Sequence, residues 1–388
     1  MGLSSKVFWS CPIVIYFATK LDLFSTKREG CAYAIMALYT YPGNIHVHST
    51  YSDGSGSIKQ IAIDAARAGL SFVIITDHET LKGLAEEGLH CKVVTLVGTE
   101  INRSSNHYLA FDLERTVHSN EDCPQEVIDE VNRQGGFGII AHPFEKGSPY
   151  LEKGQAYPWI NWPVFGFTGL EIWNYSSHWR GLHPSLLRTI YHFFFNRKAA
   201  MRGAPQEVLA LWDCYNASGH RVIGIGGSDA HALIYRFGFL TLQIFSYQFI
   251  FGTINTYLQL EEELVEDFQM AKIQILSAIK DGRCYISFDS LAKGSGFNFC
   301  AASGQKLYLM GSALTYTPGL TLEARVPAKR AHFRLIRNGR VIYTGSGSGF
   351  QFPVQQPGVY RLEVFYKTLL GRPRPWIYSN PIFINKGE

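Results

Sequence analysis

Residues 44–55 read Asn-Ile-His-Val-His-Ser-Thr-Tyr-Ser-Asp-Gly-Ser, and the interpretation of the whole chain begins from this stretch. A short apolar run ends in His46 and His48, whose side chains point the same way in an extended strand. Asp53 follows in a Ser-Asp-Gly turn. Two imidazoles and a carboxylate at the end of a strand are typical metal ligands. A single His-x-His pair is weak evidence, so the interpretation depends on how later strands end.

Later segments repeat this arrangement of an apolar strand followed by a ligand-type side chain. A continuous β-branched run at 71–76 stops just before His78, and the run at 93–97 leads to Glu100. The candidate metal ligands are His46, His48, Asp53, His78, Glu100, His107, His142, Asp229 and His231. Nine such side chains at strand ends would be a large coincidence, so we interpret them as one site.

Segments with helical periodicity alternate with these strands. Ser57 is suited to cap a helix that ends at Gly69, and Pro124 and Pro205 are suited to begin two more. Alternating strands and helices predict a parallel sheet with helices outside it. Functional groups at the carboxyl ends of parallel strands favour a βα barrel. About six or seven such units fit between 42 and 292, so we predict an α/β domain with an irregular barrel there.

The sequence changes character after Gly294-Ser-Gly296. Apolar and polar residues then alternate, and Asn338-Gly339 is a hairpin signal between two such runs. Short strands with regular turns predict a small all-β, immunoglobulin-like sandwich over 293–388. The predicted organisation is therefore an N-terminal extension (1–41), a barrel (42–292) and a sandwich (293–388).

Composition narrows the classes of protein. The chain has 388 residues, of which 46% are hydrophobic and 18% charged, and this is typical of a globular protein with room for two domains. A net charge of +4 without a long basic run predicts no nucleic-acid partner. The apolar run at 7–19 is too short to span a bilayer, so no stable membrane insertion is expected. Seven scattered cysteines favour reduced thiols and a cytoplasmic location.

In their order, the motifs resemble the PHP (polymerase and histidinol phosphatase) superfamily of metallohydrolases. The matching motifs are His46-Val-His48, Ser52-Asp53-Gly54, Thr76-Asp77-His78, Gly98-Thr-Glu100, Ala141-His142-Pro143 and Ser228-Asp229-Ala-His231. The resemblance covers about 42–290 and implies a distorted (β/α)7 TIM-like barrel with two or three divalent metal ions at its mouth. The C-terminal segment, with its ending at 375–381, looks like the branch that includes carbaryl-hydrolase-like enzymes.

The resemblance also implies which residues bind which ion. The first ion would take His46, His48, Glu100 and Asp229; the second would share Glu100 and add His107 and His142; the third would take Asp53, His78 and His231. Asp77 is interpreted as a turn or supporting residue rather than a ligand. Mixed nitrogen and oxygen ligands suit Zn, Mn or Fe better than Ca or Mg.

This ligand set predicts a metal-dependent hydrolase, most simply a phosphoesterase that uses a metal-bridging hydroxide on a small phosphate ester. We find no nucleophile elbow and no cysteine with a suitably spaced histidine. Asp229 and Glu100 are the predicted catalytic residues, and Asp229 would orient or deprotonate the water. Arg180, Arg236 and Lys146 follow ligand-bearing strands and are predicted to bind the phosphate.

Two alternatives stay open. The same activated water can attack the carbonyl of a carbamate, an amide or a carboxylic ester, and the C-terminal resemblance favours this chemistry. A non-catalytic binding module, with the sandwich as its working part, is the second alternative. The substrate in either enzymatic case is a small molecule, and the sequence indicates no oligomeric state.

Overall fold

The computed structural model describes residues 21–22, 37–150, 154–182, 185–197, 201–238, 240–367 and 371–387. The apolar run at 7–19 lies outside these residues. A two-residue strand, β1 (Leu21–Asp22), pairs with β2 (Ala37–Val47), so part of the predicted N-terminal extension belongs to the sheet. Among the described helices, every one is too short or too polar to cross a lipid bilayer.

The central sheet is organised around β2. Its parallel strands are β2, β3 (Phe72–Ile75), β5 (Val93–Val97), β8 (Phe137–Ile140), β9 (Gly169–Asn174) and β10 (Ile223–Ala230). β2 lies between β3 and β10, β5 follows β3 on one side, and β9 and β8 follow β10 on the other. Their β-branched runs are buried on both faces, as expected of parallel strands.

The parallel arrangement predicted for the whole sheet is wrong for β7 (Tyr108–Phe111), which runs antiparallel to β6 (Thr99–Ile101) and to β8. The loop between β6 and β7 is too short for a crossover helix, so the chain must turn back. β6 continues from β5 past Gly98 and stays beside the end of β3 through a bridge between His78 and Glu100. With β5 and its continuation β6 taken as one position, the strand pairings therefore run from β2 through β3, β5/β6, β7, β8, β9 and β10 back to β2.

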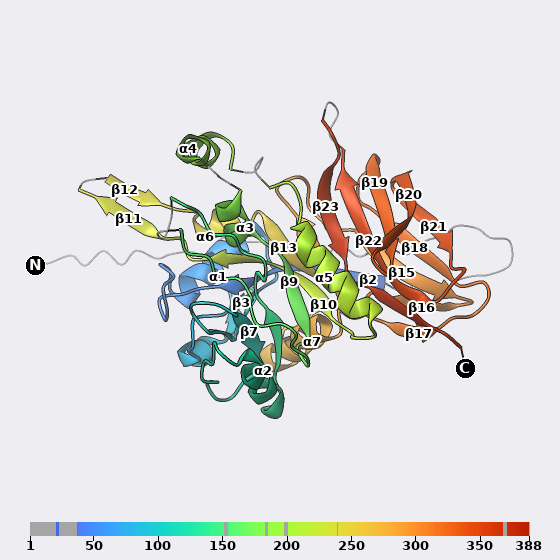
Figure 1. Ribbon diagram of the computed structural model, residues 1–388, viewed down its shortest axis with the longest axis horizontal. Coiled ribbons are helices and arrows are strands. Elements are labelled where there is room, and N and C mark those ends of the chain that lie inside the picture. The colour runs from blue at the N-terminus through green and yellow to red at the C-terminus, as the bar shows by residue number, and fades with distance from the viewer. Residues whose placement is uncertain are drawn as a thin grey trace, which may run out of the picture.

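Helices cover this sheet on the outside, and their ends follow the sequence signals. They are α1 (Ile58–Ala68), α2 (Pro124–Arg133), α5 (Gln206–Ala217) and α7 (Phe268–Lys280) (Figure 1). The Ser57 hydroxyl accepts a hydrogen bond from the Gln60 amide, and Gly69 ends α1 at a φ of 78°. Ile275 and Ile279 of α7 pack with apolar residues of several strands, among them Ile45, in one core cluster.

The amino-terminal half of β2 also belongs to a second run of antiparallel strands. In order of pairing, these strands are β13 (Ile254–Leu260), β14 (Cys284–Phe288), β23 (Arg374–Ser379), β22 (Gly358–Tyr366), β19 (Ala331–Arg337) and β20 (Arg340–Gly347). β24 (Ile382–Asn385) also pairs with β22, and β17 (Ala313–Thr315) runs parallel to β24. Asn338-Gly339 forms the turn between β19 and β20, as its sequence predicts.

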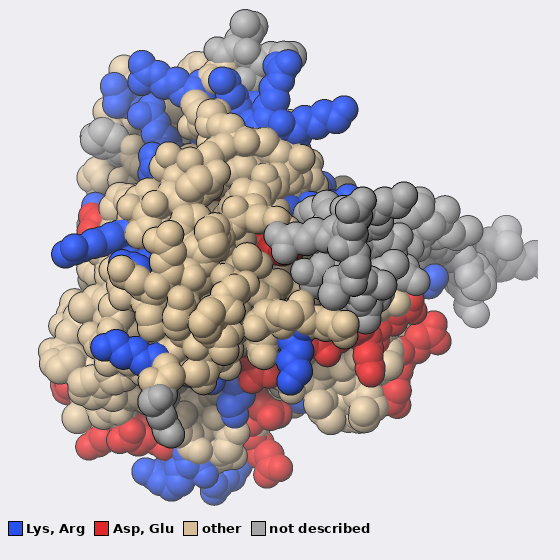
Figure 2. Space-filling view, turned by 90° about the vertical axis from the view of Figure 1, so that its right-hand side faces the viewer, with Lys and Arg blue, Asp and Glu red and all other residues tan. Residues whose placement is uncertain are grey.

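A separate four-stranded sheet lies against this run (Figure 1). It consists of β16 (Lys306–Leu309), β15 (Asn298–Ser303), β18 (Thr321–Arg325) and β21 (Gly349–Pro353). Apolar side chains of the two layers, such as Phe299 and Leu362, share one core cluster. Figure 2 shows the face of the molecule at this end, where uncharged residues cover the centre and the charged ones gather toward the edges.

The chain thus has the mixed α/β fold with a large central sheet that the sequence predicts. The boundary proposed at 292/293 falls between β14 and β15, but β14 pairs with β23 across it. Arg361 of β22 forms an ion pair with Asp213 of α5, and the Asn380 side chain bonds to the backbone of Gly224. The C-terminal strands are therefore joined tightly to the rest.

Further elements lie at the opposite end, where α4 and the β11–β12 hairpin project in Figure 1. They are α3 (Tyr175–Gly181), α4 (Leu186–Phe195), β11 (Ile234–Phe237), β12 (Leu240–Gln243) and α6 (Tyr247–Ile250). The β11–β12 hairpin was not predicted from the sequence. A 3₁₀ helix (Lys82–Glu86) and β4 (Gly88–His90) complete the described elements near β5.

The cysteines differ in one respect from the expectation of reduced thiols. Cys123, Cys214, Cys284 and Cys300 are free, but Cys91 is disulfide-bonded.

Candidate metal centre

The site begins at the carboxyl end of β2, where the strand is irregular. The pairing of β2 with β3 shifts register between Ile45 and Val47, and His46 between them has a φ of 79°. Asp229, in the irregular end of β10, has a φ of 51°. Left-handed backbone is uncommon for residues other than glycine and concentrates at functional sites. These bends help direct the polar side chains at the ends of β2 and β10 toward one point.

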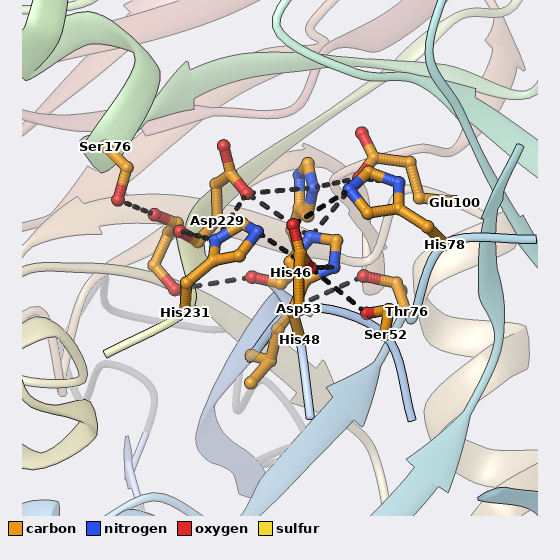
Figure 3. A network of polar contacts seen from close by, with 12 residues as sticks. His46, His48, Ser52, Asp53, Thr76, His78, Glu100, Ser176, Asp229 and His231 are labelled. Carbon is orange, nitrogen blue, oxygen red and sulfur yellow. Dashed lines mark hydrogen bonds and ion pairs between the residues drawn. The ribbon is translucent and has the colours of Figure 1, made fainter. Parts of the chain in front are cut away.

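The first group of potential ligands consists of His46, His48, Glu100 and Asp229 (Figure 3). The Nε2 atoms of His46 and His48 lie 3.1 and 3.2 Å from Oε2 of Glu100. The same nitrogens lie 3.5 and 3.3 Å from Oδ1 of Asp229. The ligand atoms of all four residues lie within 4.8 Å of one another, which is close enough for a single ion.

Three further groups overlap with the first, and one of them consists of His46, His142 and Glu171. Oε1 of Glu100 lies 2.7 Å from Nδ1 of His107 and 3.4 Å from Nε2 of His142. On the other side, Oδ1 of Asp53 lies 3.2 Å from Nε2 of His231, and these two residues form a group with His48 and His78. Glu100 therefore belongs to two groups through its two oxygens, and His48 belongs to two through its two nitrogens. The structure brings all nine sequence-predicted ligands together.

Several ring nitrogens in these groups are buried without a hydrogen-bond partner among the described residues. They are both nitrogens of His48, Nδ1 of His78, Nε2 of His107 and Nδ1 of His142. A buried polar atom left unpaired costs free energy, so such atoms are rare unless they have a role. The nitrogen and oxygen donors are the types that divalent transition metals prefer. The residues present therefore fit bound metal ions.

The charges of the site follow from burial and proximity. Burial alone would raise the pKa of the Glu100 carboxyl, but His46, His107 and His78 hold it well below its usual value. Burial alone would lower the pKa of His48, yet the nearby carboxylates of Asp229 and Glu100 raise it to about 9. Burial lowers the pKa of His78 to about 4. Without ions, the ionised Glu100 carboxylate therefore lies beside a protonated His48 imidazole.

Glu171 is a member of the site that sequence reasoning missed. Its two carboxylate oxygens each lie 3.2 Å from Nδ1 of His46, and one of them accepts hydrogen bonds from the His142 amide and the Asn174 side chain. Gly227 leaves room for it, because a Cβ there would lie 2.0 Å from Oε1 of Glu171. The available signal was a glutamate inside the otherwise apolar run of β9.

Hydrogen bonds from neighbouring loops hold the ligands in position. Asp77 accepts hydrogen bonds from the Ser49 amide at 2.7 Å and from the Ser52 hydroxyl at 2.6 Å, which orders the turn that carries Asp53. This agrees with its interpretation as a supporting residue. The Tyr247 hydroxyl donates to the carbonyl of His48 at 2.7 Å.

A cavity of about 500 Å³, which we call the metal cavity, opens over the ligands. Its other lining residues are Tyr51, Ser52, Arg103, Tyr157 and Arg180. The Arg180 side chain is 15% exposed, forms an ion pair with the fully buried Glu145, and lies over the Tyr157 ring at 5.5 Å. Arg103, which sequence reasoning also missed, is exposed and pairs with Glu79 at 2.7 Å.

The other two predicted phosphate ligands lie elsewhere. Lys146 is exposed, pairs with Glu207 at 2.9 Å and lines a separate small cavity of about 190 Å³ beside His142. Arg236 is exposed on β11 and lies outside the residues that line the metal cavity. Of the three predicted phosphate-binding residues, Arg180 is therefore the one that lines the metal cavity with the candidate metal ligands.

The part of the chain that contains most of the candidate ligands matches a known family. Residues 44–146 match the model of the PHP domain. Over these residues the chain is similar to the PHP domain. The matched segment contains every candidate ligand except Asp229 and His231, which the fold brings in from β10 and the loop after it. The resemblance to the PHP superfamily is thereby confirmed for residues 44–146, whereas the resemblance of the C-terminal segment to carbaryl-hydrolase-like enzymes stays a prediction.

Individual relatives resemble parts of the chain. An uncharacterized protein of Methanocaldococcus jannaschii is 27% identical over 115 residues, which are 26% of this chain and 67% of that protein. A phosphoribosyl 1,2-cyclic phosphate 1,2-diphosphodiesterase of Eggerthella lenta is 36% identical over 75 residues, 19% of this chain and 26% of that enzyme.

Among solved structures, a two-domain protein of Bacteroides vulgatus that contains a predicted PHP-like metal-dependent phosphoesterase is similar over 89% of this chain and 95% of its own. Its sequence identity is 13% and its TM-score 0.40.

Proposed function

We propose that this protein is a metal-dependent phosphoesterase that hydrolyses a small phosphate ester. The observation that carries the proposal is the overlap of the ligand groups at Glu100 and His48, beneath a cavity that also contains the Arg180 guanidinium. Overlapping groups suit two or three divalent ions of Zn, Mn or Fe, bound by the nine ligands assigned above. The PHP domain at 44–146 and the phosphodiesterase among the relatives support this reading.

Divalent ions held by these groups would lower the pKa of a coordinated water toward about 7 and offset negative charge on the ester oxygens. Asp229 presents Oδ1 to the histidines, while Oδ2 accepts a hydrogen bond from the Ser177 hydroxyl at 3.3 Å. Burial would raise its pKa, but His46, His231 and His48 hold the pKa well below the usual value. A carboxylate so strongly ionised is suited to orient a water by accepting its hydrogen bond.

Recognition of the phosphate is assigned first to Arg180. A guanidinium presents a fork of donors that matches two phosphate oxygens. Its pairing with Glu145, whose Oε2 lies 3.2 Å from Nδ1 of His142, fixes it beside the ligands. Arg103 is a second candidate from its position in the cavity lining. Lys146 and Arg236 stay predictions from sequence.

The ring of paired strands from β2 back to β2 supports a further proposal, that the site lies at the mouth of a distorted seven-stranded barrel. The division into an extension, a barrel and an immunoglobulin-like sandwich is likewise proposed. The cytoplasmic location and the lack of a nucleic-acid partner stay predictions.

The test is a substrate panel on the purified full chain after loading with Mn²⁺ or Zn²⁺, with metal content measured by mass spectrometry. We expect bound transition metal and turnover of p-nitrophenyl phosphate or bis(p-nitrophenyl) phosphate. His46→Ala should abolish turnover and lower metal content, whereas His332→Ala, on β19, is the matched control. Turnover of p-nitrophenyl acetate alone would favour the carbonyl alternative. A chain that binds no transition metal would refute the enzyme assignment.

A further inference from the structure

A second cavity of about 450 Å³, which we call the apolar cavity, opens beside the metal cavity. The two cavities share four lining residues, Asp53, Arg180, Asp229 and His231. The remaining lining comes from α3, α4, the segment around the β11–β12 hairpin and α6. The two cavities therefore adjoin each other at the candidate metal ligands.

The walls of the apolar cavity consist of aromatic and aliphatic side chains. Trp179, Phe193 and Phe245 are buried and pack edge to face or tilted against one another, and they form its inner wall. At its rim, Ile190 is 43% and Phe194 58% exposed. Large apolar side chains left exposed around a concave apolar wall mark a binding site more often than a bare surface.

The serine and threonine hydroxyls in this lining are already engaged with the backbone. The Ser176 hydroxyl donates to the carbonyl of Ser228 at 2.7 Å, and the Thr189 hydroxyl donates to the carbonyl of Ser185 at 3.1 Å. Charged groups occur where the apolar cavity meets the metal cavity, in the four shared residues. The site as a whole is therefore charged at one end and apolar at the other.

We propose that the natural substrate is a phosphate ester of an apolar alcohol, either aryl or long alkyl, whose apolar group occupies the apolar cavity. The proposal rests on the phosphoesterase function proposed above and names its substrate class. The phosphate lies in the metal cavity beside Arg180. In the reaction a water oxygen joins phosphorus, the P–O bond to the alcohol breaks, and the leaving alcohol takes up a proton that the water gives up. No other reactant is needed.

The volume and the chemistry of the lining define what the cavity accepts. Cavities of roughly 300–1,000 Å³ hold small organic ligands. Each methylene that leaves water for an apolar wall contributes about 0.8 kcal/mol, which is about a fourfold gain in affinity. Butyl and octyl chains should therefore be distinguished strongly.

The experiment measures kcat/KM for methyl, butyl and octyl phosphate by release of inorganic phosphate, below the concentration at which octyl phosphate forms micelles. We expect kcat/KM to rise by about tenfold or more from methyl to octyl phosphate. Ile190→Asp should reduce the octyl-to-methyl ratio by about tenfold, because it puts a charge on the rim. Leu187→Asp is the matched control on the same helix, since Leu187 is 81% exposed and outside the lining, and it should leave the ratio unchanged.

Phe194→Ser serves as a second rim variant if Ile190→Asp does not fold, and it should lower the same ratio. Equal kcat/KM for the three esters in a protein that hydrolyses them would overturn the inference and leave the phosphoesterase function intact. No hydrolysis of any phosphate ester by the metal-loaded chain would overturn both. The source of the ester is tested by comparing phosphatidic acid in phosphatidylcholine vesicles with soluble octyl phosphate. Faster hydrolysis of phosphatidic acid would assign the substrate to a membrane, and faster hydrolysis of octyl phosphate would assign it to solution. Either result supports the inference.

Discussion

Both carboxylate oxygens of Glu171 lie 3.2 Å from Nδ1 of His46, although the two residues are 125 positions apart in the chain. The contact leaves Nε2 of His46 directed toward Glu100 and Asp229, because the two ring nitrogens point in opposite directions. A carboxylate on the far nitrogen of a ligand histidine selects its tautomer and raises its basicity. We therefore assign Glu171 to positioning His46.

The first prediction concerns this contact. Glu171→Gln keeps the shape of the side chain and removes its charge, so it should weaken metal binding by about 10- to 100-fold. Competition with a chelator measures the affinity. Glu323→Gln, in the four-stranded C-terminal sheet, is the matched control and should bind metal like the wild type. Wild-type affinity in Glu171→Gln would show that His46 is oriented without it.

A second prediction concerns Gly227, whose backbone lies against the Glu171 side chain. Gly227→Ala would place a Cβ 2.0 Å from Oε1 of Glu171 and 2.7 Å from the carbonyl of Ile45. The carboxylate must then move away from His46, so we expect a loss of metal affinity at least as large as that of Glu171→Gln. Chelator competition again provides the measurement, and unchanged affinity would contradict the packing described here.

A third prediction follows from the protonation of the metal-free site. The pKa of His48 is raised to about 9, so its imidazole carries a proton at pH 7 before metal binds. A ligand histidine must be neutral, so metal binding should release about one proton or more per chain at pH 7. Metal affinity should accordingly fall as the pH drops below 9. A pH indicator in weak buffer detects the release on addition of Zn²⁺, and an unchanged pH would contradict the charge state deduced here.

A fourth prediction separates the candidate phosphate ligands. Arg180→Lys retains the charge opposite Glu145 but loses the donor fork, so KM for a phosphate ester should rise by about tenfold. Arg236→Ala should change KM less, because that side chain lies outside the lining of both cavities. Steady-state kinetics with p-nitrophenyl phosphate compare the two variants. A larger effect of Arg236→Ala would restore it as the principal phosphate ligand.

A fifth prediction tests how firmly the C-terminal strands are attached. Both terminal nitrogens and Nε of Arg361 bond to Asp213 or Glu363 at 2.7–2.8 Å, and the side chain is 6% exposed. Arg361→Met leaves two carboxylates without their partner, which should lower the free energy of unfolding by about 3–5 kcal/mol. Urea unfolding measures it. Arg334→Met, at an exposed position of β19, should cost less than about 1 kcal/mol. Equal effects would show that the buried pair contributes little.

Local signals predicted much of the fold. Ser57, Gly69 and Pro124 mark helix ends in the structure because caps and backbone restrictions act within a few residues. The antiparallel direction of β7 was missed, because the chain gives no periodic signal for direction. The nine residues that the sequence predicted as ligands all lie in ligand groups of the structure, since most of them follow a recognisable strand. Glu171 was missed because it lies inside an apolar run, where a carboxylate has no sequence motif of its own.

The sequence by itself determined the residue types at the strand ends and hence the metal chemistry available to the protein. The tertiary structure alone decided that Arg180 faces the ligands while Arg236 does not, and that an apolar cavity adjoins them. The physical reason is that strand and helix signals are local, whereas these relationships depend on contacts between segments far apart in the chain.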